Sequence, residues 1–266
     1  MSAVEANKFV ASAWAPGPEI KRVAVKGGAM LYDASRVSNF AAGWFDRIYW
    51  IARSAVRGEA PGRGSTLFFE TEGLHGALRH YQRGGLMAKL RGDRYPFSTE
   101  MATRPVREFL LTYQLYCRGL PVPAPIACRY LRSGNDYTAD LITARVPATE
   151  SLAARMKAGT LSLSLWVAVG RCIRRFHDVG ACHADLNAHN VLLSSEDSVY
   201  LIDFDRGSLR GAGWWRDDNL VRLRRSLEKV SDQLPSGAFA EPDWQSLLAG
   251  YRETVERPGS PQSASA

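Results

Sequence analysis

A carboxylate, an amide and a second carboxylate follow one another at fixed spacings between His183 and Asp205. Asn190 stands five positions after Asp185, and Asp203 stands eighteen positions after the same residue. Two short runs of apolar, β-prone residues lie between Asn190 and Asp203, which predicts a hairpin. Because a hairpin brings its two ends together, we expect the three side chains to converge at one mouth. Side chains of these types, gathered in one small volume, suit metal-assisted phosphoryl transfer.

The pattern HADLNAHN followed by DFD fits the motif of kinases, which accept a proton from a hydroxyl and hold Mg²⁺ on the phosphates of ATP. In that motif Asp185 is the base, and Asn190 and Asp203 are the metal ligands, with the hard oxygen atoms that Mg²⁺ prefers. His183 is expected to orient the catalytic loop through hydrogen bonds. Asp and Asn are also common turn residues, but ordinary turns do not require this whole set of spacings.

Glycines upstream of the motif predict a loop that covers the phosphates. Gly58, Gly62 and Gly64 precede a strand-like run at 66–70, and a turn at Gly73 leads to a second strand. Glycines let the backbone approach phosphate groups and point N–H groups at them. Any hairpin needs turn glycines, so the assignment of Gly62 and Gly64 to nucleotide binding depends on their position upstream of the catalytic motif.

A kinase also needs a cation on the nucleotide phosphates, held by a carboxylate on a helix. Arg79 lies in the second strand, where protein kinases carry a lysine, and its planar fork would hold phosphate with a different geometry from an ammonium group. Lys89 is the alternative cation. A helix is predicted from near Thr103 to Gly119, and Glu108 is its only acidic residue. We therefore expect Glu108 to pair with Arg79.

The remaining elements predict an α+β, bilobal, protein-kinase-like fold. Two strands after the helix complete an N-terminal lobe that we expect to be an antiparallel sheet of five strands with one main helix, followed by a mostly helical C-terminal lobe. The expected division is an N-terminal extension packed on or near the N-lobe (1–43), a nucleotide-binding N-lobe (44–143), a catalytic C-lobe (144–256) and a disordered tail (257–266).

Composition favours an anionic partner. The 266 residues are 45% hydrophobic and carry a formal net charge of +7, which suits nucleotide, nucleic acid or an acidic membrane surface. No nucleic-acid reader pattern is present, and the four cysteines lack the CxxC spacing of zinc sites. We expect neither a signal peptide nor a transmembrane helix, because the first residues lack a basic region followed by an apolar run and no stretch approaches eighteen apolar residues. Aromatic and basic residues at 44–57 predict a helix that rests on anionic lipid or, as we favour, packs on its own domain.

From about Trp44 to Tyr251 the chain resembles the lipopolysaccharide kinase family, in the stretches GRGSTLFF, ALRHYQRGGL, KLRGDRY, GLPVPAPIA, CHADLNAHNVLL and LIDFDRG. The resemblance implies a protein-kinase-like fold, ATP and Mg²⁺ as cofactors, and phosphorylation of a sugar of the lipopolysaccharide inner core. For the branch that acts on 3-deoxy-D-manno-octulosonic acid (Kdo), it implies transfer to the 4-hydroxyl of Kdo on a lipid A precursor, Kdo-lipid IVA.

The same resemblance implies a peripheral position at the cytoplasmic face of the bacterial inner membrane, with the anionic glycolipid and the membrane surface as partners. Basic residues after the second hairpin strand would steer that acceptor; these are Arg83, Lys89, Arg91 and Arg94. Nucleic acid is not an expected partner, because the Arg and aromatic residues follow helical core spacing. The sequence does not indicate an oligomeric state.

The third residue of the DFD triplet departs from the usual DFG. Asp205 puts a side chain where a flexible glycine normally lies, and it either restricts that turn or contacts a second metal ion.

Three other functions share part of this pattern. A soluble small-molecule kinase of the aminoglycoside or choline type carries similar loops, a protein kinase has the same chemistry, and a catalytically dead kinase fold could act as a binding module. The short segment after DFD disfavours a docked protein substrate, and the intact Asp185, Asn190 and Asp203 disfavour a dead site.

Overall fold

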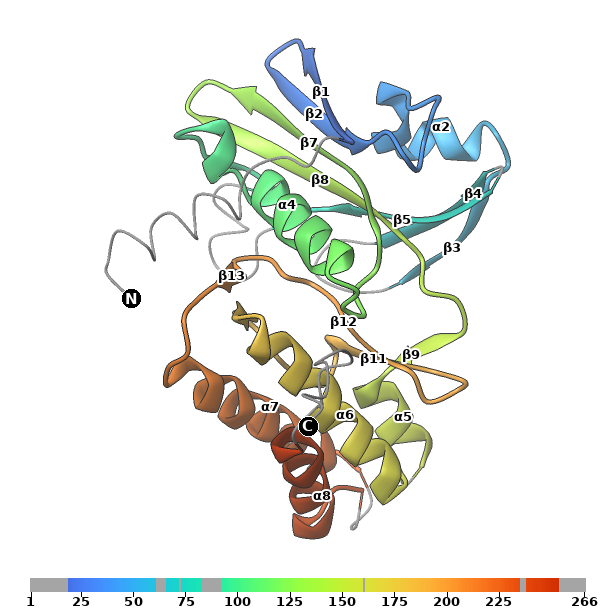
Figure 1. Ribbon diagram of the computed structural model, residues 1–266. Helices are drawn as coiled ribbons and strands as arrows, with labels where there is room; N and C mark the ends of the chain where they lie inside the picture. Colours follow the sequence, from blue (N-terminus) through green and yellow to red (C-terminus); the bar gives the residue numbers. More distant parts are fainter. Residues whose placement is uncertain are drawn as a thin grey trace, which may run out of the picture.

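The computed structural model shows two lobes, an antiparallel sheet crossed by helix α4 (Arg104–Cys117) and a mostly helical lobe beneath it (Figure 1). The α+β, bilobal fold predicted from the sequence is confirmed. The structure describes residues 19–60, 66–71, 73–82, 92–159, 161–234 and 238–253.

The N-terminal sheet has eight strands in the described residues, all paired antiparallel. Seven of them lie in the order β1-β2-β7-β8-β5-β4-β3, and β6 pairs with β8. Their bounds are β1 (Ile20–Val25), β2 (Gly28–Asp33), β3 (Val56–Ala60), β4 (Thr66–Thr71), β5 (Leu74–His80), β6 (Tyr95–Pro96), β7 (Pro125–Ser133) and β8 (Asp136–Ala144).

The expected number of five strands is therefore wrong. The edge strands β1 and β3 are exposed along most of their length, so they carry little of the apolar alternation by which a strand is recognised in a sequence. β6 has only two residues. The hairpin of β1 and β2 lies in the segment expected to be an extension, and β2 is largely buried against β7.

The aromatic segment that follows packs on its own lobe. It forms a 3₁₀ helix, η1 (Ala42–Phe45), and a short helix, α2 (Arg47–Ile51), capped by Asp46, whose carboxylate accepts a bond from the Ile48 N–H at 2.9 Å. Trp50 is buried and stacks on Phe69 of β4 with ring centroids 3.8 Å apart. The helix is shorter than predicted because the chain turns at Ser54, with φ of 53°, into β3.

Helix α4 packs on the sheet, most closely on β7. Pro105 lies in its first turn, where a missing N–H costs nothing. Val106, Phe109 and Leu110 are buried against the sheet, and Gly119, with φ of 71°, turns the chain away at the end. The 3₁₀ helix η2 (Glu100–Ala102) precedes it. The helix predicted here is confirmed.

The C-terminal lobe packs its helices and short strands around one apolar core. Helix α6 lies against α8, and each contributes a glycine to the contact: a Cβ on Gly170 would lie 2.0 Å from the Leu247 carbonyl oxygen, and one on Gly250 would lie 2.1 Å from that of Val167. Within the described ranges, no helix is long and apolar enough to cross a bilayer. The elements are β9 (Thr149–Ser151), α5 (Leu152–Ala158), α6 (Leu163–Asp178), β10 (Ala181–Cys182), β11 (Val191–Ser194), β12 (Val199–Leu201), β13 (Ser208–Leu209), α7 (Trp215–Ser231) and α8 (Glu241–Arg252).

Acid should destabilise this lobe through His177, which is 1% exposed at the contact between α6 and α8. Burial lowers the pKa of His177 to about 4, from an ordinary value of 6.5. The unfolded chain therefore takes up a proton that the folded chain excludes. The contribution of this group is complete above about pH 6.5, and up to about 3 kcal/mol of unfolding free energy should be lost as the pH falls to about 4.

Urea unfolding of wild type and His177→Gln at pH 7, 5.5 and 4.5 tests this prediction. The variant should be less stable at pH 7, because it alters the bond to the Tyr251 hydroxyl, but it should lose less stability on acidification. An equal loss in both proteins would contradict the assignment to His177.

Candidate active site

The hairpin of β11 and β12 brings the two ends of the motif together. Val191 pairs with Leu201, and the Ile202 N–H donates to the Asn190 carbonyl oxygen at 3.0 Å. Asn190 and Asp203 therefore lie at the same open end of the hairpin, because Asp203 follows directly after Ile202. The convergence expected from the spacing is present.

His183 joins the catalytic loop to this end of the hairpin. Its Nε2 lies 2.9 Å from the Ile202 carbonyl oxygen, and its Nδ1 accepts the Asp185 N–H at 3.1 Å. The tautomer that satisfies both bonds carries its proton on Nε2 and is neutral. Burial lowers the pKa of His183, which agrees with this state. His183 thus positions the backbone of Asp185.

The side chain of Asn190 completes the loop. Its Nδ2 donates to the Asp185 carbonyl oxygen at 2.9 Å, and Asn187 donates to the same oxygen at 3.0 Å. Asn190 is 8% exposed, whereas the Asp185 carboxylate is more than half exposed. The aspartate is therefore held by its backbone, with its side chain open to an incoming substrate.

Gly180 sets the start of this loop after α6. Its φ is 79°, and a Cβ would lie 2.3 Å from the carbonyl oxygen of Arg210, just after β13. The glycine that follows α6 is thus needed both for the turn and for a close backbone approach.

Arg79 links three elements. Its guanidinium donates from Nη2 to Glu108 of α4 at 2.5 Å and from Nη1 to Asp203 at 2.6 Å. Glu108 is 4% exposed and also accepts a bond from the Tyr81 hydroxyl. Burial raises the pKa of Glu108, and the adjacent Arg79 guanidinium opposes that rise. Burial would also raise the pKa of Asp203, but the Arg79 charge outweighs it, so the pKa of Asp203 is lowered overall.

This geometry gives a physical reason for arginine where a lysine was expected. Two nitrogens of one fork contact two carboxylates from different elements, whereas an ammonium group is a single point of charge. The ion pair expected between Arg79 and Glu108 is present. The contact of Arg79 with Asp203 and the Tyr81 hydroxyl bond were not anticipated.

The DFD triplet is tied to the first turn of α4. Asp203 has φ of 64° and Arg206 has φ of 62°, so the backbone enters the left-handed region on both sides of Asp205. The Asp205 carboxylate accepts a bond from Arg104 Nε at 2.8 Å and forms an ion pair with Arg104 Nη2. The Arg104 guanidinium also lies 4.6 Å from the ring centroid of Tyr95. The side chain that replaces the usual glycine thus restrains the turn from α4.

A double-mutant cycle tests this link between Arg104 and Asp205. The side chains of Arg104 and Asp205 are largely buried, at 24% and 16% exposed. Either Arg104→Met or Asp205→Leu alone leaves one charge without its counterpart, so each should lower the unfolding free energy by about 1–3 kcal/mol. The double variant should lose less than the sum of the two, by about 0.5–3 kcal/mol. Urea unfolding measures all four proteins, and strictly additive losses would contradict the coupling.

Helix α7 also contributes contacts that were not anticipated. The Asn219 Oδ1 accepts the His183 N–H at 3.1 Å, and the Ser226 Oγ accepts the Ala188 N–H at 3.1 Å. Leu220, Leu223 and Leu227 recur at helical spacing and form the buried face of this helix. The polar residues between them recur at helical spacing, which indicates a second, polar face of the helix but not the segment that this face contacts.

Several expected site residues lie outside the described residues: Gly62, Gly64, Arg83, Lys89 and Arg91. Arg94 is described, is exposed, and donates to the Ser133 hydroxyl at 3.4 Å. In the described part of the chain, no three His, Cys, Asp or Glu side chains form a metal-binding group. A metal ion at this site would depend on the pair of Asn190 and Asp203.

The model of the lipopolysaccharide kinase (Kdo/WaaP) family matches residues 48–251. The chain belongs to this family. Among its relatives, a 3-deoxy-D-manno-octulosonic acid kinase of Haemophilus influenzae (strain 86-028NP) is 41% identical over 231 residues, which cover 84% of this chain and 95% of that protein. The enzymes of the same name from Mannheimia succiniciproducens and Vibrio vulnificus (strain YJ016) are 40% and 39% identical, over 79% and 83% of this chain and 90% and 93% of their own lengths.

The family assignment agrees with the geometry of the site. A loop aspartate, an asparagine and a second aspartate converge at one hairpin mouth, beside an arginine held by a helix carboxylate. The chain is therefore an enzyme of the kinase class, as its sequence predicts.

Proposed function

We propose that the chain is an ATP- and Mg²⁺-dependent Kdo kinase, which transfers the γ-phosphate of ATP to the 4-hydroxyl of a Kdo residue on the lipid A precursor Kdo-lipid IVA. The observation that carries this proposal is the convergence of Asp185, Asn190 and Asp203 in a chain about 40% identical, over most of its length, to Kdo kinases. The position of the hydroxyl, the lipid and the cofactors are parts of the proposal.

In this proposal Asp185 accepts the proton of the attacking hydroxyl, and its exposed carboxylate supports that role. Neutral His183 positions the loop, and Arg79, held by Glu108, contacts the nucleotide phosphates. Gly62 and Gly64 are proposed to cover those phosphates.

The donor atoms at the hairpin mouth fit a magnesium ion. The Asn190 amide nitrogen is used by the Asp185 carbonyl oxygen, which leaves Oδ1 as an acceptor. Asp203 Oδ1 is bonded to Arg79, which leaves Oδ2. Two oxygen donors together with phosphate oxygens and water are the usual environment of Mg²⁺ in kinases. The ion would neutralise charge on the transferred phosphate.

We also propose that the enzyme works at the cytoplasmic face of the inner membrane as a peripheral protein. The excess of basic residues supports attraction to anionic lipid. On α2, Ile48 and Ile51 are 70% and 52% exposed, and two such apolar side chains beside Arg47 and Arg53 are compatible with a lipid surface.

Incubation of the purified protein with labelled ATP and Mg²⁺ tests the function. One arm contains Kdo-lipid IVA, and the other contains soluble aminoglycosides and choline. Label in the lipid, with a mass increase of one phosphate on the Kdo residue, is the expected result. Label only in a soluble alcohol would replace the proposal with a small-molecule kinase.

A further inference from the structure

Helix α7 presents three polar side chains to the catalytic loop at helical spacing. Asn219, Arg222 and Ser226 occupy positions i, i+3 and i+7, which share one face of a helix. Asn219 bonds to the backbone of His183 and Ser226 bonds to that of Ala188. Arg222 lies between these two anchors, and its Nη1 is 3.6 Å from Asp185 Oδ1. Its place beside the proposed base is therefore set by the packing of α7 on the loop.

Stability does not account for an arginine at this position. The side chains of Arg222 and Asp185 are both 55% exposed, and exposed ion pairs contribute little to folding. At 3.6 Å the two groups are also beyond ordinary hydrogen-bond distance. A guanidinium has five N–H donors in a planar fork that matches a carboxylate in bidentate fashion. Arg222 thus offers an accessible carboxylate-binding group next to the atom that must receive the proton.

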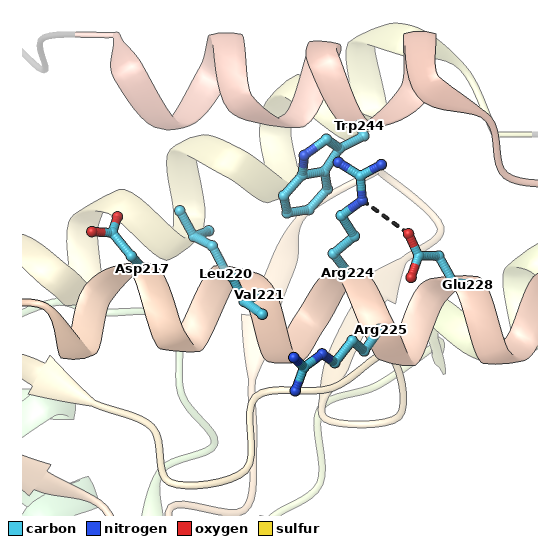
Figure 2. Close-up of a pocket in the computed structure, with 7 residues that line it drawn as sticks. All are labelled: Asp217, Leu220, Val221, Arg224, Arg225, Glu228 and Trp244. Carbon is cyan, nitrogen blue, oxygen red and sulfur yellow. Dashed lines mark hydrogen bonds and ion pairs between the residues drawn. The ribbon is translucent and has the colours of Figure 1, made fainter.

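The two arginines that follow in the same helix are placed differently. Arg224 extends toward Trp244 of α8 and bonds to Glu228 at 2.9 Å, whereas Arg225 extends in another direction (Figure 2). Arg224 is also bonded to Glu241 at 2.8 Å. Arg225 lines the groove between α7 and Trp244. Of the three arginines in this run, Arg222 is the one that faces Asp185.

The acceptor named for the relatives is a sugar acid. If the proposed function holds, a hydroxyl of that sugar must come within about 3 Å of the Asp185 carboxylate, and the sugar's own carboxylate then lies about one ring width away. That carboxylate, the base and the ATP phosphates are all negative and repel one another. A cation on the acceptor side of the base would offset this repulsion.

We propose that Arg222 binds the carboxylate of the acceptor sugar, so that it selects an acidic sugar and turns the reacting hydroxyl toward Asp185. This inference rests on the proposed function, because it takes the acceptor class from there.

The test compares two acceptors, Kdo-lipid IVA and the same lipid with the Kdo carboxylate as its neutral methyl ester. Wild type should prefer the acid by about 10²-fold in kcat/KM, as expected where a site group is left unpaired by the wrong substrate. Arg222→Gln should lose about 10²-fold on the acid and little on the ester, so that the preference collapses. Its KM for ATP should be unchanged, and Arg222→Lys should retain part of the preference.

Arg225→Gln is the matched control, because it removes another exposed arginine charge from the same helix and should keep the wild-type preference. Equal losses of Arg222→Gln on acid and ester would overturn the inference and leave Kdo kinase activity standing. Failure of wild type to phosphorylate either lipid would instead overturn the proposed function, so the two failures are distinguishable.

Discussion

Replacement of Asp185 by asparagine should lower kcat by about 10²- to 10⁴-fold while ATP binding stays close to that of wild type. The amide is nearly isosteric but cannot accept the hydroxyl proton. The backbone of residue 185 keeps its bonds to His183, Asn187 and Asn190, so the loop should hold its shape. The loss is therefore expected in the chemical step.

Single-turnover phosphorylation of Kdo-lipid IVA and equilibrium titration with ATP measure the two quantities separately. Asp178→Asn provides the control, because that exposed carboxylate pairs with Arg174 of the same helix, α6, rather than with a residue of the loop. It should retain wild-type turnover. Turnover by Asp185→Asn within a few fold of wild type would exclude Asp185 as the base.

Replacement of Arg79 by methionine should reduce both stability and activity. Glu108 would remain buried without its cation, a change that costs about 3–5 kcal/mol of unfolding free energy. Transfer should also fall by about 10²- to 10³-fold, because the variant lacks the charge that is proposed to contact the phosphates. Arg79→Lys should remain impaired, since one ammonium group does not replace a fork that contacts both Glu108 and Asp203.

The double variant Arg79→Met with Glu108→Gln separates the two effects. It removes both buried charges, so urea unfolding should show much of the lost stability restored. Its kcat/KM for ATP should stay as low as that of Arg79→Met. Recovery of activity along with stability would show that Arg79 has only a structural role.

An exposed pair provides the control for this series. Arg57 and Glu70 lie on the neighbouring strands β3 and β4, with side chains 47% and 41% exposed. Arg57→Met should leave the unfolding free energy nearly unchanged, because solvent screens such pairs. A loss of unfolding free energy as large as that of Arg79→Met would show that burial of the Arg79–Glu108 pair is not what makes the Arg79 substitution costly.

The sheet was the part of the fold predicted least well. Strands β4, β5, β7 and β8 carry apolar residues on a buried face and were recognised. β1 and β3 are edge strands held by backbone hydrogen bonds to one neighbour. Their side chains face solvent, so their sequences lack the pattern that burial imposes.

Helix α4 was predicted closely, and the C-terminal lobe is mostly helical as expected, but the segment at 44–57 was not predicted well. α4, α6, α7 and α8 each bury a face that recurs at helical spacing. The aromatic residues at 44–50 show the same spacing, but they are buried by a 3₁₀ turn and a single short helix. The secondary structure of this segment is therefore set by tight aromatic packing around Trp50 rather than by the helical spacing of its apolar residues.

The sequence by itself determined the reaction. The hairpin that brings Asn190 to Asp203 forms from neighbouring residues, and closing a short loop costs little entropy, so residue types and spacing were sufficient. The kinase template also indicated Arg79 and Glu108 as partners, because Arg79 lies in the strand where a cation is expected and Glu108 is the only acidic residue of the predicted helix. Only the tertiary structure decided that Asp205 is held by Arg104 and that Arg222 stands beside Asp185. Those partners are brought together when α4 and α7 pack against the catalytic loops, and no local pattern in the chain records which polar side chains of a helix face a distant loop.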